Sequence, residues 1–251
     1  MIESFKGRTA IISGSSSGIG LSTLIKFAKN GCNIVSFSNN PNQKLDLEIN
    51  NISKKFKVDI DHHYLDITKS DSVKKFVALL REKKININYL INNAGVLNNS
   101  LIQMTKETDL IKMFEVNFNS QVFLTQQILK LMLKSNEPKA IINVVSTSAF
   151  DNNFGRFAYS SSKAALLSFS QTLFKEVASY GIRVNAIAPG MTNTKLMNDN
   201  TQKKFIAEAI DKISLKRIAE PDEIANVILF LCSDLSSYIN GQTIRVDGGM
   251  C

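Results

Sequence analysis

The sequence predicts a single α/β domain, a Rossmann-like doubly wound parallel sheet of about seven strands with helices on both faces. Three observations predict it. Short β-like runs alternate with longer amphipathic stretches along all 251 residues, several of these runs are almost uniformly apolar, and a glycine-rich turn follows the first run. Strands that are apolar throughout are typical of parallel sheets covered on both faces. The chain shows no linker, low-complexity tract or internal repeat, so we expect residues 1–251 to form one domain.

The alternation predicts each element in order. Strands are expected at Thr9–Ser13, Asn33–Phe37, His63–Leu65, Tyr89–Ile91, Ala140–Val145, Arg183–Ala188 and Thr243–Val246. Helices are expected at Ile19–Asn30, Leu45–Phe56, Ser70–Lys84, Glu107–Lys134, Phe157–Tyr180, Thr201–Ile213 and Pro221–Ser233. Repeated strand–helix–strand units favour a doubly wound sheet. The last helix has a strong start signal, because Pro221 loses no hydrogen bond at the first helical position and Asp222 and Glu223 complement the helix dipole.

Two of these helices are apolar on more than one face. In Phe157–Tyr180 a second stripe contains Leu167 and Phe174, and in Glu107–Lys134 a second stripe contains Phe118. A helix that is apolar nearly all round is either deeply internal or shared with another subunit. We favour the shared face, and the expected assembly is a homotetramer, or at least a dimer.

Composition excludes several classes of protein. With 44% hydrophobic and 21% charged residues the chain is an ordinary globular protein. The net charge is +8, but the lysines are scattered singly and in pairs, so we expect no nucleic-acid partner. Nothing resembles a signal peptide, and no run approaches the roughly 18 apolar residues of a membrane span, so no membrane partner is expected. Cys32, Cys232 and Cys251 form no CxxC pattern, so we predict no metal site and a reduced, cytoplasmic setting.

Residues 9–20 have the pattern of a strand, a glycine-rich turn and a helix start. In such a segment the glycines permit a tight turn, close approach of the backbone to a pyrophosphate, and close helix–strand packing; here they are Gly14, Gly18 and Gly20. The N–H groups at the helix start then face the phosphates. The spacing is Gly-x3-Gly-x-Gly, and a Gly/Ser cluster can also form a plain loop. Its position between a strand and an amphipathic helix favours dinucleotide binding.

Tyr159 and Lys163 lie four residues apart on a helical pattern, so both project from one face. Carbonyl reduction requires a proton on the oxygen as hydride reaches the carbon, and a tyrosine with its ordinary pKa of about 10 is poorly matched to neutral pH. A nearby ammonium lowers that pKa. An ordinary surface helix can carry the same pair, so the spacing alone does not establish a site.

A hydroxyl group lies thirteen residues before the tyrosine, where Ser146 ends the apolar run 141–145. Ligands of open α/β sheets bind outside the carboxyl ends of the strands, so this hydroxyl can reach a substrate oxygen. Ser148 is an alternative for the same role, and both serines could instead cap a loop.

With the three glycines, the serine and the tyrosine–lysine pair in this order, the chain resembles the short-chain dehydrogenase/reductase family. Other segments match the family pattern along essentially the whole chain. They are Leu65-Asp66-Ile67-Thr68 beside the adenine, Asn92-Asn93-Ala94-Gly95 after the fourth strand, Asn117 on the long helix, Pro189-Gly190 with Thr194 near the nicotinamide, and Val246-Asp247-Gly248-Gly249 at the C-terminal end.

The resemblance implies a role for each residue of the site. Tyr159 is the general acid/base, and Lys163 holds the nicotinamide ribose and lowers the pKa of the tyrosine. Ser146 hydrogen-bonds the substrate oxygen and is preferred over Ser148, because the family spacing to the tyrosine is usually close to thirteen. Asn117 holds a water that links the lysine to solvent. The residues implied to bind the dinucleotide are Gly14, Ser16, Ser17, Gly18, Ile19, Gly20, Ser38, Asn39, Asp66, Ile67, Asn93, Ala94, Gly95, Tyr159, Lys163, Pro189, Gly190, Thr192 and Thr194.

The subgroup that the chain resembles most is the 3-oxoacyl-(acyl-carrier-protein) reductases, on residues 176–185 and 220–225. Those reductases often have a basic residue, thought to help dock the acidic carrier, where this chain has Tyr180; Lys134 and Lys175 could serve instead. Many relatives of this subgroup act on sugars, alcohols or small ketones. The resemblance therefore implies a small-molecule or carrier-bound ketone or alcohol as the substrate.

The predicted end of the second strand bears on the cofactor. In the family an acid at this place binds the ribose hydroxyls of NAD and repels a 2′-phosphate. Residues 36–40 read SFSNN, without that acid and without the arginine that many NADP enzymes place just after it. Ser38, Asn39 and Asn40 can hydrogen-bond a phosphate, and Lys44 is close in sequence, so NADP is favoured over NAD.

Three functions therefore stay open on the sequence. The preferred one is an NADPH-dependent reductase of a 3-oxoacyl thioester or similar ketone. The others are an NAD-dependent dehydrogenase of a sugar or other secondary alcohol, and a non-catalytic dinucleotide-binding module, against which the intact Ser146, Tyr159 and Lys163 argue. We expect the segment from Met191 to about Ile213 to cover the substrate and to decide specificity.

Overall fold

The computed structural model of the chain describes residues 5–134, 137–151 and 154–250. Its sheet has seven parallel strands in the order β3-β2-β1-β4-β5-β6-β7. The strands are β1 Thr9–Ser13, β2 Asn33–Ser38, β3 Ile60–Tyr64, β4 Tyr89–Asn92, β5 Lys139–Val144, β6 Ile182–Pro189 and β7 Thr243–Val246. The predicted doubly wound parallel sheet in a single α/β domain is confirmed.

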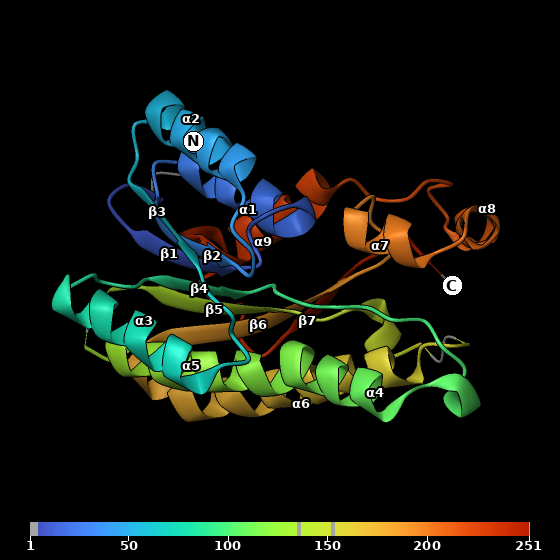
Figure 1. Cartoon of the computed structure of the whole chain (residues 1–251). Helices are drawn as coiled ribbons and strands as arrows, with labels where there is room; N and C mark the ends of the chain where they lie inside the picture. The colour runs from blue at the N-terminus through green and yellow to red at the C-terminus, as the bar shows by residue number, and fades with distance from the viewer. Residues whose placement is uncertain (1–4, 135–136, 152–153, 251) are drawn as a thin grey trace.

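Helices cover both faces of this sheet. They are α1 Gly18–Lys29, α2 Gln43–Phe56, α3 Ser70–Glu82, α4 Glu107–Phe114, α5 Ser120–Met132, α6 Phe157–Val177, α7 Lys195–Asn200, α8 Lys203–Lys212 and α9 Pro221–Cys232. Figure 1 shows α1, α2 and α9 on one face and α3, α5 and α6 on the other. Phe27 of α1 and Ile228 of α9 belong to the buried cluster on the first face. Leu80, Leu124 and Leu173 bring α3, α5 and α6 into the cluster on the second.

The strand order reverses direction at β1, which pairs with β2 on one side and with β4 on the other. In open α/β sheets the loops on the two sides of such a point leave the sheet in opposite directions, which opens a crevice at the carboxyl ends of the strands. The fold therefore places the loops after β1 and β4 on the two sides of one crevice. In Figure 1, α7 and α8 extend beyond this edge of the sheet.

The predicted helix Glu107–Lys134 is helical from Glu107 to Met132, but it is not α-helical throughout. A π-helical turn at Glu115–Asn119 divides it into α4 and α5, and the hydroxyl of Ser120 donates to the carbonyl of Glu115 within this wider turn, at 2.6 Å. One wide turn rotates the apolar stripes without interrupting them, so the sequence periodicity did not show the break.

The predicted helix Thr201–Ile213 is present as α8, which begins two residues later and ends one residue earlier. A further short helix, α7, was not predicted, and Thr201 between the two has an extended backbone. Thr194 caps α7 by accepting a hydrogen bond from the N–H of Met197 at 3.2 Å. The capping threonine therefore starts a helix upstream of the predicted segment.

The second apolar stripes are more covered within one chain than the sequence analysis expected. Leu167 is only 8% exposed and lies in a cluster with Val145 and Leu166. Phe174 is partly buried, and its ring lies so close to Gly241 that a Cβ there would approach it to 2.7 Å. The stripes alone therefore do not require a partner subunit.

Across the described ranges, no helix is both long enough and apolar enough to cross a membrane.

Candidate active site

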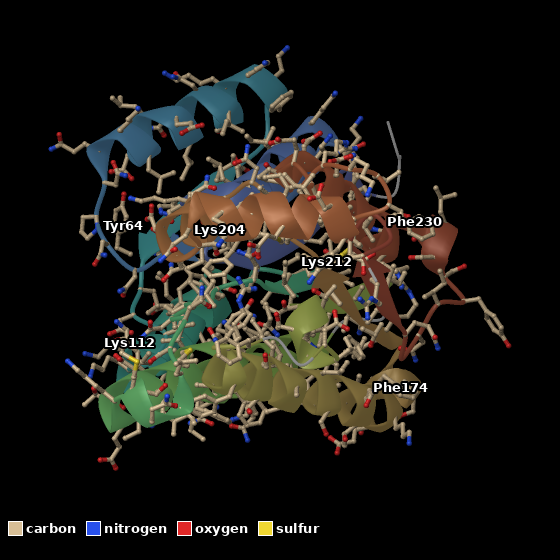
Figure 2. The ribbon with its side chains drawn as sticks, turned by 90° about the vertical axis from the view of Figure 1, so that its right-hand side faces the viewer. Tyr64, Lys112, Phe174, Lys204, Lys212 and Phe230 are labelled. Carbon is tan, nitrogen blue, oxygen red and sulfur yellow. The ribbon has the colours of Figure 1, made fainter. Side chains whose placement is uncertain are left out.

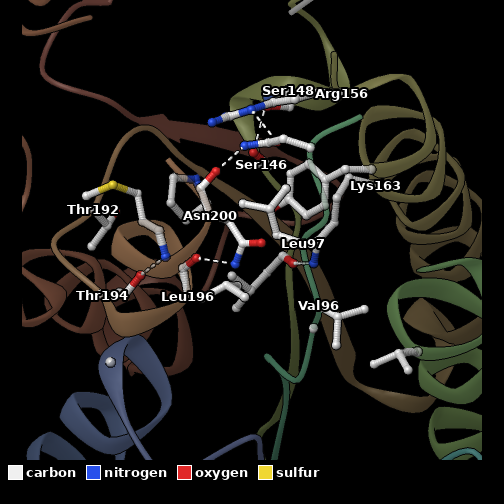
Figure 3. A pocket seen from close by; sticks show the side chains of 18 of the residues that line it. Val96, Leu97, Ser146, Ser148, Arg156, Lys163, Thr192, Thr194, Leu196 and Asn200 are labelled. Atoms are coloured by element: carbon white, nitrogen blue, oxygen red, sulfur yellow. Dashed lines mark hydrogen bonds between the residues drawn. The ribbon is translucent and has the colours of Figure 1, made fainter. Parts of the chain in front are cut away.

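A cleft of about 1390 Å³ opens at the carboxyl edge of the sheet. Its walls come from the loops after β1, β2, β4, β5 and β6 and from α7 and α8. Of the residues predicted to bind the dinucleotide, the following line it: Gly14, Ser16, Ser17, Gly18, Ile19, Ser38, Asn39, Asp66, Ile67, Asn93, Ala94, Gly95, Tyr159, Lys163, Pro189, Gly190, Thr192 and Thr194. Figure 3 shows Ser146 and Lys163 across this pocket from Thr192 and Thr194. The fold thus brings segments far apart in the sequence to one site.

The glycine-rich turn leaves room that any side chain would fill. Gly14 has φ +67°, and a Cβ there would lie 2.8 Å from the Cα of Ala94. Gly20 does not line the cleft, but a Cβ on it would lie 2.1 Å from the carbonyl oxygen of Gly14. Within the described structure no side chain caps the start of α1 at Ser17, so the first N–H groups of the helix are available to an anion. This cradle fits the pyrophosphate of a dinucleotide.

The loop after β4 is tied directly to the glycine-rich turn. The side-chain amide of Asn93 donates to the carbonyls of Ser13 and Gly14 at 3.0 and 3.1 Å. The backbone N–H groups of Asn93 and Ala94 donate to the hydroxyl of Ser13 at 2.8 and 3.0 Å. These bonds hold the two loops together at the carboxyl ends of β1 and β4. No sequence pattern indicates a role for Ser13, because this contact depends on β1 and β4 being neighbours in the sheet.

Tyr159 and Ser146 meet in the cleft. The hydroxyl of Ser146, directly after β5, forms a side-chain hydrogen bond with Tyr159 on α6. The N–H of Ser148 donates to the same serine hydroxyl at 3.2 Å, so the backbone holds Ser146 in place. Ser148 also lines the cleft. The arrangement places two hydroxyl groups where one substrate oxygen can contact both.

Burial is the main influence on the pKa of Tyr159, and it raises that pKa; the Ser146 hydrogen bond and the charge of Arg156 act in the opposite direction. This differs from the expectation that the ammonium of Lys163 would dominate. Lys163 is 4% exposed and its ammonium donates to the carbonyl of Val144 at 2.8 Å. Burial lowers the pKa of Lys163 to about 8. The raised pKa keeps the hydroxyl of Tyr159 protonated at neutral pH.

Asn117 lies in the π-helical turn and is fully buried. Its carbonyl oxygen accepts from the N–H of Val96 at 2.8 Å, and its amide donates to the carbonyl of Val96 and to the hydroxyl of Ser162, both at 3.0 Å. A Cβ on Gly95 would lie 3.2 Å from Asn117 Oδ1 and 3.5 Å from Lys163 Nζ. Asn117 thus links the loop after β4 to α6, close to the lysine.

A histidine that no sequence pattern indicated lies behind the part of the cleft that Ser38 lines. Ser38 at the end of β2 lies with its hydroxyl 3.2 Å from Nε2 of His62, and the hydroxyl of Ser36 lies 2.7 Å from Nδ1 of the same ring. Parallel pairing of β2 with β3 places Ser36 beside His62, which no sequence spacing reveals. Lys44 is exposed on α2 and does not line the cleft.

The far wall is formed by the segment after β6. The hydroxyl of Thr192 donates to the carbonyl of Gly190 at 3.1 Å. Gly190 packs against the C-terminal segment, since a Cβ there would lie 2.7 Å from Cβ of Asp247. Residues 191–212 then cross the mouth of the cleft, as the sequence analysis expected of a substrate-covering segment. Arg156, which also lines the cleft, has no role in the sequence analysis.

Comparison with known proteins agrees with this geometry. A family model described as enoyl-(acyl carrier protein) reductase matches residues 14–251. The chain is 35% identical over 247 residues to 3-oxoacyl-(acyl-carrier-protein) reductase FabG of Thermotoga maritima, covering 98% of each chain. Among solved structures it is similar to L-sorbose reductase of Gluconobacter frateurii complexed with NADPH and L-sorbose, with 32% identity, a TM-score of 0.90, and coverage of 100% of this chain and 98% of that one.

A second solved structure has a similar likeness at lower identity. It is a putative gluconate dehydrogenase from Agrobacterium tumefaciens, with 26% identity, a TM-score of 0.93, and coverage of 100% of this chain and 98% of that one. The family match spans more than nine-tenths of the chain and includes the glycine-rich turn and the serine, tyrosine and lysine of the cleft. The chain is therefore an NAD(P)-dependent oxidoreductase and belongs to the short-chain dehydrogenase/reductase family.

Proposed function

We propose that the chain reduces a ketone to a secondary alcohol with NADPH. The observation that carries this proposal is the hydrogen bond between Ser146 and Tyr159 at the carboxyl edge of the sheet, with the ammonium of Lys163 buried on the same helix. Tyr159 donates its proton to the carbonyl oxygen, and Ser146 hydrogen-bonds that oxygen as negative charge develops on it. The bound nicotinamide supplies the hydride. Reduction of a simple ketone with NADPH, followed by the loss of absorbance of the reduced cofactor, tests the proposal.

The preference for NADP rests on the end of β2. In the described structure Ser38 and Asn39 line the adenosine end, and β2 contributes no carboxylate there. Their hydrogen-bonding side chains suit a 2′-phosphate, and the formal net charge of +8 favours a phosphate-bearing ligand.

We expect Ser38→Asp to weaken NADPH binding relative to NADH by at least about tenfold, because the new carboxylate repels the 2′-phosphate. Dissociation constants for both cofactors, measured by fluorescence titration at pH 8, test this. Burial lowers the pKa of the His62 ring, so the ring is neutral at pH 8. This matters because a positively charged ring beside Ser38 would offset the charge of the new carboxylate. Ser70→Asp, at the exposed start of α3, is the control. An unchanged ratio would mean that other groups read the phosphate.

Two substrate classes have support. The first is a 3-oxoacyl thioester, because the curated relatives are named 3-oxoacyl-(acyl-carrier-protein) reductases. Lys112 and Lys212 line the cleft, and Figure 2 shows them on α4 and α8 on the same side of the molecule, where they could meet an acidic arm. Tyr180, in place of the basic residue of those reductases, is 57% exposed.

The second class is a small, polar secondary alcohol or ketone. The solved relatives named for sorbose and gluconate point to it, and so does the polar lining of the cleft at Asn99, Asn200 and Thr201. A panel of one 3-oxoacyl thioester, one sugar ketone and one simple oxo acid, each with NADPH and with NADH, separates the two classes.

We also propose that the chain assembles into a homotetramer or at least a dimer through the α4–α5 segment and α6. The resemblance to the family supports assembly more than the second apolar stripes do, because side chains such as Leu167 and Phe174 are already covered in part within one chain. Light scattering at several micromolar concentrations is expected to give a mass of two or four times 27.9 kDa. A single-chain mass at every concentration would contradict the proposal.

A further inference from the structure

A guanidinium group stands at the substrate end of the cleft. Arg156 directly precedes α6 and lines the cleft together with Ser146 and Tyr159, as Figure 3 shows for Arg156 and Ser146. Its Nε donates to Oδ1 of Asn99 at 3.1 Å, and its Nη2 donates to the hydroxyl of Thr201 at 3.4 Å. Both of these acceptors are neutral, so the positive charge of the side chain is not balanced by either contact.

Three of the other arginines have carboxylate partners, whereas Arg81 and Arg183 form no ion pair among the described residues. Arg8, Arg217 and Arg245 each form an ion pair at 3.3 Å or less. Among the described residues Arg156 forms no ion pair, and its Nη1 has no protein acceptor. A guanidinium offers several N–H donors in a planar fork that matches a carboxylate, and a partly buried one is stabilised by such a partner.

The carboxylates on that side of the cleft have other contacts. Glu115 accepts a hydrogen bond from Asn119 at 3.0 Å, and Glu208 lies 4.0 Å from the ammonium of Lys204. Neither therefore supplies the missing partner for Arg156 in this structure. The guanidinium remains a positively charged donor that faces the substrate space.

The position of Arg156 limits where its ligand can be. It lies one helical turn before Tyr159, near enough for its charge to lower the pKa of the tyrosine. Asn99, from the loop after β4, and Thr201, from the segment between α7 and α8, hold the guanidinium from two sides. A group bound to Arg156 is therefore attached to the substrate close to the carbonyl that Ser146 and Tyr159 contact.

We propose that Arg156 binds a carboxylate of the substrate, so that the chain acts on small oxo acids in preference to neutral ketones. This inference rests on the ketone reduction proposed above and narrows its substrate. An oxo acid presents its carbonyl to Ser146 and Tyr159 and its carboxylate to the free face of the guanidinium. A thioester carries no charge at this place and leaves the guanidinium with its two neutral acceptors.

The test compares each acid with its own neutral ester. The probes are 2-oxopentanoate, 3-oxopentanoate and 4-oxopentanoate, each beside its methyl ester, and the N-acetylcysteamine thioester of the 3-oxo acid, all with NADPH. For at least one chain length we expect kcat/KM for the acid to exceed that for the ester by about 10- to 100-fold, the effect of a charged hydrogen bond. Arg156→Gln should bring this ratio close to one, and Arg156→Lys should keep part of it.

Two further variants separate ligand binding from a structural role. Arg81→Gln, on the exposed face of α3, is the matched control and should leave the ratio unchanged. Asn99→Ser removes one contact of Arg156 but not its charge, and should keep the preference for the acid. If Arg156 only joins the two loops, Arg156→Gln and Asn99→Ser will lower acid and ester rates by the same factor, and the inference is overturned.

The outcomes also distinguish this inference from the proposed function. Turnover of the esters or the thioester without preference for an acid of any length would overturn the role of Arg156 and leave ketone reduction intact. No turnover of any ketone in the panel, with NADPH bound, would refute the proposed function itself.

Discussion

Replacing Tyr159 by phenylalanine is expected to lower kcat for ketone reduction by a factor of about 100 to 10,000, the range that a positioned proton donor contributes. The change removes one hydroxyl and its hydrogen bond with Ser146, and it leaves the aromatic ring in place. Affinity for NADPH should change little, because the glycine-rich turn and the start of α1 bind the phosphates. Steady-state rates together with a fluorescence titration of NADPH measure both effects.

The control is Tyr238→Phe, since Tyr238 is fully exposed and distant from the cleft. It should have the kinetics of the unmodified chain. A Tyr159→Phe protein that keeps near-normal kcat would show that another group donates the proton. Loss of NADPH binding in the same variant would instead indicate that the tyrosine mainly supports the shape of the cleft.

Lys163→Ala is expected to lower both turnover and NADPH affinity, each by at least about tenfold. The residue is buried, and its ammonium is held by the carbonyl of Val144 next to Gly95, on the wall that the nicotinamide ribose would contact. Removing it takes away the positive charge on that wall and a hydrogen-bond donor, and one charged hydrogen bond alone is worth about 1.5–3 kcal/mol. The melting temperature should be measured too, because the carbonyl of Val144 loses its hydrogen bond from the lysine and the fold could lose stability with it.

The pH dependence of NADPH binding gives a second check on Lys163. Burial lowers its pKa to about 8, so the ammonium is present below that pH and is lost as the pH rises through it. An anionic cofactor binds the charged form better, so affinity should fall above about pH 8 in the unmodified chain and stay level in Lys163→Ala. Lys175→Ala, on the exposed face of the same helix, should keep the pH dependence. A pH profile that is the same in all three proteins would place Lys163 outside the cofactor site.

Local patterns were enough to predict the sheet and the centre of the site. Seven β-like runs predicted seven strands, and several of these runs are almost uniformly apolar because the central parallel strands are buried on both faces. Gly14 and Gly20 were predictable because only glycine leaves room where two backbones nearly touch. The placement of Tyr159 and Lys163 in one cleft was predictable because positions four apart share one face of a helix.

Other features depended on contacts that no single segment contains. His62 reaches Ser38 only because β3 pairs with β2, and Arg156 has its two neutral partners only because two distant loops meet beside it. The π-helical turn between α4 and α5 was missed because one wide turn leaves the apolar stripes in place, and α7 was missed because six residues are too few to show a helical period.

The sequence by itself therefore determined the fold class, and it predicted the glycine-rich turn and the side chains that we propose react, because each depends on spacing within one strand, turn or helix. The tertiary structure decided the electrostatic state of the site. It partly buried Tyr159 and buried Lys163, which moves their pKa values in opposite directions, and it left Arg156 without a carboxylate partner among the described residues. Burial and charge balance arise from which segments pack together, and they are set only when the chain has folded.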